Sequence, residues 1–259
     1  MLLFSIITIN LNNATGLQKT LNSVFIQTFT NFEYIVIDGG STDKSKELIE
    51  ANSHQLAYWA SEPDAGIYHA MNKGIAIAKG EYLLFLNSGD YLNDSQVLAK
   101  VFAEQPVPDI IYGDITWETA GIHTHGLYPN QLTFDYFTNH SLPHQGAFIR
   151  KQLFSTVGLY DQQYAIIADW VFFLLAIYKF NCTYHHIGCT IAVCNRDGLS
   201  CDVNRWPEIL WQRQEVIQHN FAAFAADYQA FLAERNELKK IKKMMGFRLQ
   251  KKLQQMIRK

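Results

Sequence analysis

The chain has 259 residues, of which 48% are hydrophobic and 18% are charged, so it can bury a sizeable core and is not disordered overall. Its formal net charge is only −2, but residues 239–259 contain nine Lys or Arg and no acid, against 13 basic and 24 acidic residues before them. We therefore expect no nucleic-acid partner for the acidic body, and a separate role for the basic tail.

Short apolar runs rich in β-branched residues alternate with helix-forming segments over the first part of the chain. The predicted strands are 3–9, 32–38, 56–62 and 81–87, and the predicted helices are 16–28, 41–52 and 66–80. This alternation predicts a doubly wound, mostly parallel, Rossmann-like α/β sheet, whose ligands bind beyond the C-terminal ends of the strands. The opening "MLLFSIITINLNN" has no basic n-region and no cleavage site, so it is not interpreted as a signal peptide.

The pattern becomes less regular after residue 105. The predicted elements are a strand at 108–117, a long loop at 118–143, a buried helix at 168–180, one or two strands within 182–194 and a helix at 205–235. The longest apolar run, at 170–178, is too short to span a bilayer. The four cysteines are spaced 7, 5 and 7 residues apart without a C-x-x-C pair, which favours reduced cysteines in a cytosolic protein over a zinc site.

Polar residues follow the second predicted strand in "VIDGGSTD" (36–43). Asp38 ends the strand, and the two glycines after it allow a ligand or backbone to approach closely. Ser41 and Thr42 can cap the next helix, whose N-terminus can meet anionic groups. An ordinary βα turn is the alternative, because neither G-x-G-x-x-G nor the P-loop pattern is present.

Two further segments add charged groups near strand ends. In "SEPDAGIYHAMNKG" (61–74), Asp64 precedes a helix and Lys73 lies within it, where it can neutralise phosphate or simply face solvent. In "YLLFLNSGDYL" (82–92), a buried strand delivers Asp90 to the edge of the sheet. A single carboxylate there suits a hard divalent cation that takes its other ligands from diphosphate and water, although "SGD" is also a good turn sequence.

Asp169 is the only acid in the apolar stretch 164–176. A buried unpaired carboxylate is costly, so Asp169 should have a partner or a catalytic role. Its position before a helical run also suits an N-cap, and the two roles are compatible.

These segments carry a resemblance to a known family. Residues 4–45 and 61–90 resemble the start of a family 2 glycosyltransferase with the GT-A fold, of the subgroup that builds bacterial surface polysaccharides such as lipopolysaccharide O-antigen and capsule. The match is nearly continuous over 4–104 and looser to about residue 200. The resemblance implies an inverting transferase that uses a nucleotide sugar, most often UDP-linked, and Mn²⁺ or Mg²⁺.

The resemblance also assigns the donor site. It places Asp38 at the nucleobase and Asp90 at the metal. The remaining donor residues that it implies are Thr8, Asn10, Asp64, Lys73, Ser88, Gly89 and Arg196. The family commonly has Asp-Asp where this chain has Gly89-Asp90, and Asp-Asp-Gly where it has Asp38-Gly39-Gly40, so each motif has lost one carboxylate.

In the second half of the chain, the resemblance makes Asp169 the catalytic base. His144 and Gln145, in "LPHQGAFIR" (142–150), match the segment beside the acceptor, where they can bind acceptor hydroxyls or orient the base. The implied chemistry is a single displacement at the anomeric carbon, in which Asp169 takes the proton of the attacking hydroxyl. Two other functions stay open, a sugar-1-phosphate nucleotidyltransferase and a non-catalytic sugar- or nucleotide-binding module.

We expect a GT-A domain over 1–235 and a basic amphipathic tail over 236–259. Within the domain, 1–105 is the nucleotide-sugar half, 106–204 the acceptor and catalytic half, and 205–235 helical. The tail has apolar residues at helical spacing, namely Ile241, Met245, Leu249, Leu253 and Met256. Its charge suits an anionic membrane, which predicts a cytoplasmic protein peripheral at the inner face of that membrane, with packing on protein as the alternative. The sugar, the acceptor and the oligomeric state are not predicted.

Overall fold

A computed structural model of the chain describes residues 3–103, 107–196 and 201–257, with side chains described as far as residue 245. The chain divides into two compact units, Met1–Gln212 and Arg213–Lys259. The first unit contains the whole sheet and the predicted site residues.

The first half of the sheet is parallel, as predicted. Its strands, in spatial order, are β3 (Tyr58–Ser61), β2 (Phe32–Asp38), β1 (Phe4–Asn10) and β4 (Tyr82–Asn87). The register pairs Asn10 with Asp38 and Asp38 with Ser61, so these three side chains lie beside one another at the C-terminal edge. The strand ends therefore bring distant polar residues together, as expected for a doubly wound fold.

The second half of the sheet is mixed. It continues from β4 through β8 (Ala147–Arg150), β6 (Ile110–Thr119), β9 (Tyr184–Asn195) and β5 (Tyr91–Leu92), and β7 (Ile122–Gly126) pairs with β6. Strand β8 runs antiparallel to both β4 and β6, whereas β6 and β9 are parallel. The prediction of one loop over 118–143 is wrong, because β7 and the helix α5 (Phe134–Asn139) lie within it.

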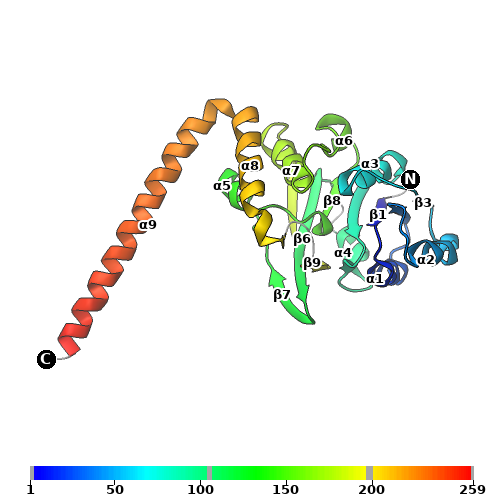
Figure 1. The fold of residues 1–259 in the computed structure, drawn as a ribbon, viewed down its shortest axis with the longest axis horizontal. Helices are drawn as coiled ribbons and strands as arrows, with labels where there is room; N and C mark the ends of the chain where they lie inside the picture. Colours follow the sequence, from blue (N-terminus) through cyan, green and yellow to red (C-terminus); the bar gives the residue numbers. More distant parts are fainter. Residues whose placement is uncertain (1–2, 104–106, 197–200, 258–259) are drawn as a thin grey trace. The chain divides into compact units, whose positions relative to one another are not determined.

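Helices cover both faces of the sheet (Figure 1). The helices on one face are α1 (Ala14–Phe25), α2 (Ser45–Ala51) and α4 (Val97–Ala103), and those on the other are α3 (Ile67–Ile77), α6 (Leu153–Thr156) and α7 (Ala168–Tyr178). Leu17, Leu21 and Val24 recur at helical spacing on α1 and pack on the sheet core with no exposed surface. On the other face, Phe85 of β4 contacts the rings of Phe154 and Tyr160. The described part of this unit also contains the 3₁₀ turns η1 (Ser53–Gln55), η2 (His144–Gly146) and η4 (Val203–Arg205).

Two helices end the chain, α8 (Trp206–Asn220) and α9 (Ala222–Ile257). The single helix predicted over 205–235 is therefore interrupted at Phe221. The Phe221 N–H donates to the Ile217 carbonyl and closes α8, and its own carbonyl accepts the first hydrogen bond of α9, from Ala225. Among the described residues, no helix combines the length and apolar character that crossing a bilayer requires.

The predicted tail lies within α9. Of the helical tail expected over 239–259, residues 239–257 are helical and 258–259 lie outside the described residues, and Ile241 and Met245 are about half exposed or more. The side chains of the other three apolar positions, Leu249, Leu253 and Met256, lie outside the described residues.

Candidate active site

A network of short hydrogen bonds surrounds Asp38 at the end of β2. Its Oδ1 accepts from Asn10 Nδ2 at 2.7 Å and from the Ser41 hydroxyl at 2.5 Å. Its Oδ2 accepts from the Ser41 N–H at 2.9 Å and the Ser61 hydroxyl at 2.7 Å. Burial acts to raise the pKa of Asp38, but the hydrogen bonds from Ser41, Ser61 and Asn10 outweigh it and lower the pKa below its usual value. Asp38 is therefore an ionised residue that organises three strand ends.

The other residues predicted at the nucleobase occupy different environments. Thr8 is fully buried and its hydroxyl lies 2.9 Å from the Tyr34 hydroxyl, so it has no surface for a ligand. Asn10 is only 4% exposed, but its Oδ1 is a buried acceptor without a partner among the described residues. The donor site proposed below therefore keeps Asn10 and omits Thr8.

Asp64 approaches the glycine that follows Asp38. A Cβ atom on Gly39 would lie only 2.6 Å from Asp64 Oδ2, so a side chain at position 39 would collide with this carboxylate. Asp64 Oδ1 accepts from the Gly66 N–H at 2.8 Å, which holds the loop before α3. The carboxylate of Asp64 therefore fills the space beside Gly39, the position at which the family motif commonly has a second Asp.

Lys73 of α3 projects toward the same loop. Its Nζ forms a 2.7 Å ion pair with Glu62, and its side chain is 24% exposed, compared with 60% for Glu62. An exposed ion pair of this kind contributes little to stability, so the ammonium group can exchange this partner for a phosphate at low cost.

The turn after β4 is held by α1. Gly89 has φ of +105°, a conformation that favours glycine. This is the position at which the family motif described above commonly has its first Asp. Its N–H donates to Thr20 Oγ1 at 3.0 Å, and the Thr20 hydroxyl donates to the Asp90 carbonyl at 2.7 Å. The Ser88 carbonyl accepts from Asn13 Nδ2 at 2.9 Å.

Asp90 lies at the base of this turn and is only 5% exposed. Its Oδ2 accepts from Gln145 Nε2 at 2.9 Å and its Oδ1 from the Asn195 N–H at 3.0 Å. Burial raises the pKa of Asp90 above its usual value, although these two bonds and the nearby His144 act to lower it. Both hydrogen-bond donors are neutral, so the charge of the ionised carboxylate is poorly compensated.

This environment fits a divalent cation. A cation would compensate the buried charge, and each carboxylate oxygen keeps lone pairs beyond its single hydrogen bond. Within the described residues, no cluster of three or more His, Cys, Asp or Glu could hold a metal. One protein carboxylate, with diphosphate and water as the other ligands, is a usual arrangement for Mg²⁺.

Asp169 lies in the first turn of α7 and is tightly held. The N-cap is Ile167, so the N-cap role considered for Asp169 is wrong. Its Oδ2 lies 2.9 Å from His144 Nδ1, and its Oδ1 accepts from the Tyr68 hydroxyl and the Trp170 N–H, both at 2.8 Å. Burial acts to raise the pKa of Asp169, but the hydrogen bond and charge of His144, with Tyr68 and the Trp170 N–H, lower it overall. The partner that the isolated acid was expected to have is thus present.

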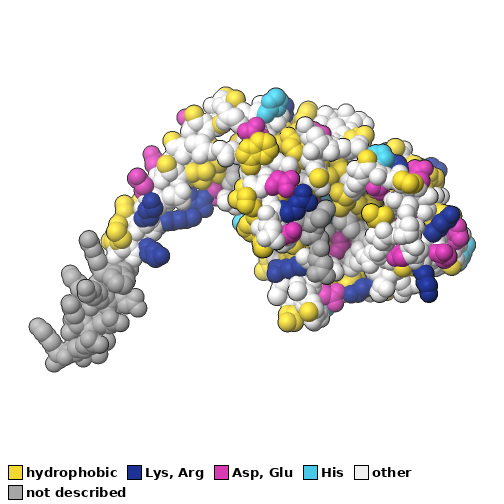
Figure 2. Space-filling view, viewed as in Figure 1, with side chains coloured by type: hydrophobic (Ala, Val, Ile, Leu, Met, Phe, Trp, Pro, Cys, Tyr) yellow, Lys and Arg dark blue, Asp and Glu magenta, His cyan; other side chains and the backbone are white. Residues whose placement is uncertain are grey.

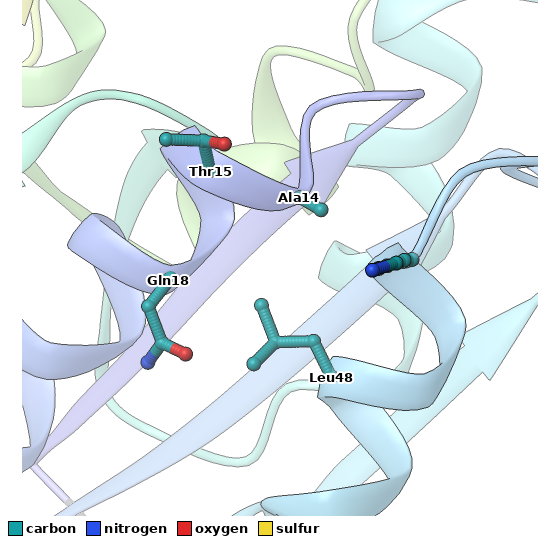
Figure 3. Close-up of a pocket in the computed structure, with 5 residues that line it drawn as sticks. Ala14, Thr15, Gln18 and Leu48 are labelled. Atoms are coloured by element: carbon teal, nitrogen blue, oxygen red, sulfur yellow. The ribbon is translucent and has the colours of Figure 1, made fainter.

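Two features lie apart from these carboxylates. The guanidinium of Arg196 lies 5.4 Å from the ring centre of Trp117, and residues 197–200 lie outside the described residues. A hollow of about 360 Å³ between α1 and α2 is lined by Ala14, Thr15, Gln18, Lys44 and Leu48 (Figure 3). None of the predicted site residues lines it.

Comparison with known proteins identifies the family. Residues 5–158, more than half of the chain, match the glycosyl transferase family 2. The chain belongs to this family. A PGL/p-HBAD biosynthesis glycosyltransferase of Mycobacterium tuberculosis (strain ATCC 25618 / H37Rv) is 35% identical over 177 residues, 66% of this chain and 68% of the relative. An uncharacterised glycosyltransferase of the same strain is 37% identical over 178 residues, with the same shares covered.

Solved structures share the fold of this family 2 chain. S. aureus TarS 1–349 in complex with UDP-GlcNAc has a TM-score of 0.66 and 19% identity, covering 84% of this chain and 66% of that chain. The mannosyltransferase PcManGT from Pyrobaculum calidifontis, in complex with GDP-Man and Mn²⁺, has a TM-score of 0.59 and 17% identity, covering 87% and 64%. The predicted GT-A fold is confirmed, and the chain spans about two thirds of each of these structures.

The structure also brings in residues that the sequence did not single out. Tyr68 reaches Asp169 from α3, and Asn195 reaches Asp90 through its backbone N–H. Ser61 completes the shell of Asp38 beside Ser41, which was expected only to cap the next helix. The sequence does not indicate which backbone N–H will donate to a side chain. A tyrosine in an apolar helix is usually interpreted as a core residue, so these contacts could be identified only from the structure.

Proposed function

We propose that this family 2 protein is an inverting glycosyltransferase, which moves a sugar from a UDP-sugar to a saccharide or lipid-linked acceptor in bacterial cell-surface polysaccharide synthesis. The observation that carries the proposal is a pair of carboxylates, Asp90 and Asp169, that two neighbouring residues of one turn contact within the family's fold and whose pKa values are shifted in opposite directions. Carboxylates in such different environments suit different tasks in one site. The PGL/p-HBAD biosynthesis name of one mycobacterial relative and the UDP-GlcNAc complex of TarS support this choice of substrates.

The donor would bind at the C-terminal ends of β1, β2 and β4. Asn10 donates to Asp38 on the nucleobase side, where Asp38 fixes the surrounding loops. Asp64 and Lys73 lie on the segment facing the nucleoside and phosphates, with Arg196, Ser88 and Gly89 as further donor residues. Asp90 would hold the Mn²⁺ or Mg²⁺, which, when bound, neutralises charge on the departing diphosphate.

The acceptor hydroxyl would attack the anomeric carbon from the side opposite the diphosphate. The new bond joins the hydroxyl oxygen to that carbon, while the bond to the diphosphate oxygen breaks and its electron pair leaves with the nucleotide. Asp169 accepts the hydroxyl proton, because its lowered pKa keeps it ionised. An α-linked donor would thus give a β-linkage.

The test is nucleotide binding followed by turnover. UDP should raise the melting temperature more in Mn²⁺ than in EDTA, and UDP-GlcNAc should release UDP slowly without an acceptor. GDP-mannose serves as a second donor class. Failure of UDP, GDP and TDP to bind with or without metal would refute the donor site, and binding without any release or transfer would favour a non-catalytic module. Pyrophosphate release from UTP and a sugar 1-phosphate would instead favour the nucleotidyltransferase.

We also infer that the basic end of α9, within 239–259, binds an anionic membrane surface. Figure 2 shows Lys and Arg side chains gathered along its described part, where Lys239, Lys240, Lys242 and Lys243 are all exposed. Exposed apolar residues accompany them, with Met244 at 55% and Met245 at 64% exposure. Positive charge beside apolar side chains is the combination that peripheral membrane helices use, and a lipid-linked acceptor would give the contact a purpose.

A further inference from the structure

One short turn contacts both buried carboxylates. In η2, His144 Nδ1 lies 2.9 Å from Asp169 Oδ2, and the next residue, Gln145, places Nε2 2.9 Å from Asp90 Oδ2. Asp90 follows β4 and Asp169 begins α7, so the turn links two elements that are remote in sequence. The two side chains that were expected to bind acceptor hydroxyls or to orient the base thus each contact a carboxylate.

The backbone of this turn is fixed by the sheet. The Gly146 N–H donates to the Pro143 carbonyl at 3.0 Å, and β8 begins at the following residue, between β4 and β6. A Cβ atom on Gly146 would lie 2.9 Å from Ile115 Cγ2 and 3.3 Å from the Gly113 carbonyl oxygen. The turn therefore packs directly on β6 with no space for a side chain, so its two neighbouring side chains start from a rigid support.

Oδ2 is the oxygen of Asp169 that is better placed to accept a proton. Tyr68 and the Trp170 N–H occupy Oδ1, while His144 alone contacts Oδ2. The side chains of His144 and Asp169 are 12% and 16% exposed, so this part of the site keeps a small surface that an acceptor hydroxyl can reach. His144 Nε2 has no partner among the described residues, which makes Nδ1 the nitrogen that is used.

Gln145 orients Asp90 without neutralising it. An amide donor supplies direction but no charge, whereas a Lys or Arg at this position would form an ion pair and compete with a cation. The buried carboxylate thus stays available for the metal proposed above.

We propose that η2 is the positioning element of the site, in which His144 orients Asp169 and Gln145 orients Asp90. This inference rests on the proposed function, because it assigns the two carboxylates to acceptor activation and to donor binding. It predicts that neighbouring residues of one turn control different measurable quantities. Loss of His144 should raise the pKa of Asp169, the proposed proton acceptor. Loss of Gln145 should lower the affinity for nucleotide in the presence of metal.

The first experiment compares His144→Asn with His144→Ala in the full chain. Asn retains an N–H donor close to the position of Nδ1, whereas Ala removes it. The titratable groups facing Asp169 are His144 on η2, Tyr68 on α3 and Tyr160 ahead of α7, and His144 also faces Asp90. Carbon-13 NMR of the aspartate carboxyls, with Asp169→Asn to assign the signal, follows the pKa of Asp169 without any substrate.

We expect His144→Ala to raise the pKa of Asp169 and His144→Asn to keep it near that of the unmodified protein. UDP release from UDP-GlcNAc should fall about tenfold in the Ala variant, with the KM for the donor unchanged and the acid limb of the rate moved to higher pH. The Asn variant should recover most of the rate. An unchanged carboxyl titration in His144→Ala, or an Asn variant no better than Ala, would overturn the orienting role of His144.

The second experiment uses Gln145→Met, which keeps the length of the side chain but removes its donor. Calorimetry should show UDP affinity in Mn²⁺ falling roughly threefold to tenfold, about the value of one hydrogen bond, while UDP affinity in EDTA and the titration of Asp169 stay unchanged. Equal UDP affinities in Mn²⁺ for the two proteins would overturn the role of Gln145. Failure of the unmodified protein to bind nucleotide would refute the proposed function, while the Asp169 titration would still decide the role of His144.

Discussion

The Tyr68 hydroxyl donates a 2.8 Å hydrogen bond to Asp169 Oδ1, across 101 positions of the sequence. The same hydroxyl lies 2.6 Å from the Ile166 carbonyl oxygen, just before α7. Burial, followed by the charge of Asp169, raises the pKa of Tyr68 well above its usual value, so the phenol remains a donor. Helix α3, which carries Lys73 on the nucleotide side, thereby also holds the proposed base.

Replacing Tyr68 with Phe should remove this donor and leave the ring in place. We expect the free energy of unfolding to fall by about 2 kcal/mol, the scale of a hydrogen bond to a charged group, and the pKa of Asp169 to rise. Urea denaturation measures the first effect. Tyr58→Phe, on β3 with 40% exposure, is the matched control and should change stability little. Equal stabilities of the two variants would show that the Tyr68 hydroxyl contributes nothing.

Asp169→Asn should retain the shape of the side chain but lose the proton acceptor. We expect sugar transfer and UDP release to fall by about 100-fold or more, the usual scale for a general base, with nucleotide affinity little changed. Isothermal calorimetry and a UDP-release assay separate these quantities. Asp161→Asn, an exposed acid in the preceding loop, provides the control. Turnover of the Asp169 variant close to that of the control would exclude the base role.

Asp90→Asn should make the protein more stable at neutral pH. The raised pKa of Asp90 means that its charged form is disfavoured in the folded state, so ionisation above that pKa costs stability and a neutral side chain avoids the cost. Gln145 can turn its amide to match the new side chain. The melting temperature should rise without metal, and the extra stabilisation by UDP in Mn²⁺ should disappear.

Differential scanning fluorimetry with Mn²⁺ or EDTA checks both halves of this prediction. Asp94→Asn is the control, because Asp94 is a surface acid that pairs with Lys100 at 2.7 Å. A metal response that survives in Asp90→Asn would place the cation elsewhere.

The parallel half of the fold could be predicted because each strand is a short apolar run that ends in a polar residue. The register of β1, β2 and β3 then brings Asn10, Asp38 and Ser61 together, as the strand-end argument expects. The second half could not be predicted in this way. β7 alternates Ile122, His123, Thr124 and His125 and is largely exposed, so it lacks the apolar run that marks a buried strand.

The geometry of the site depends on where β8 lies in the sheet. Strand β8 enters the sheet antiparallel between β4 and β6, and only this placement brings Gln145 to Asp90 and His144 to Asp169. No local pattern in "LPHQGAFIR" encodes which carboxylate each side chain meets. The resemblance could name the segment and allowed its residues to orient the base, but it gave no indication that Gln145 meets Asp90.

The Asp38 network should make the protein sensitive to acid. The pKa of Asp38 is lowered in the folded state, so its contribution to stability is complete above the unfolded pKa of about 3.9 and is lost as pH falls through the lower folded value. Asp38→Asn should weaken this pH dependence and, because the Asn amide cannot accept from all four donors, destabilise the protein at neutral pH by roughly 3 kcal/mol. Urea denaturation between about pH 5 and pH 2 tests both effects. Parallel stability curves for the two proteins would contradict this role.

Removing the basic end of α9 tests its membrane role. A chain ending at Leu238 should stay folded and bind nucleotide normally, because the predicted site residues all lie within the first unit. It should lose co-sedimentation with vesicles that contain phosphatidylglycerol, since each nearby Lys or Arg contributes about 1 kcal/mol to binding an anionic surface. The full chain should bind these vesicles at low salt and release them as salt is added.

A charge variant separates the electrostatic from the apolar contribution. Changing Lys239, Lys240, Lys242 and Lys243 to Gln keeps the helix and its exposed apolar residues, so any loss of vesicle binding reports charge alone. We expect most binding to be lost, because four of the nine basic residues in 239–259 are removed and each contributes about 1 kcal/mol to binding an anionic surface. Vesicle binding by the Gln variant equal to that of the full chain would assign the contact to apolar insertion. If the unmodified chain ignores anionic vesicles at low salt, the exposed side of α9 would instead be a surface for packing on protein.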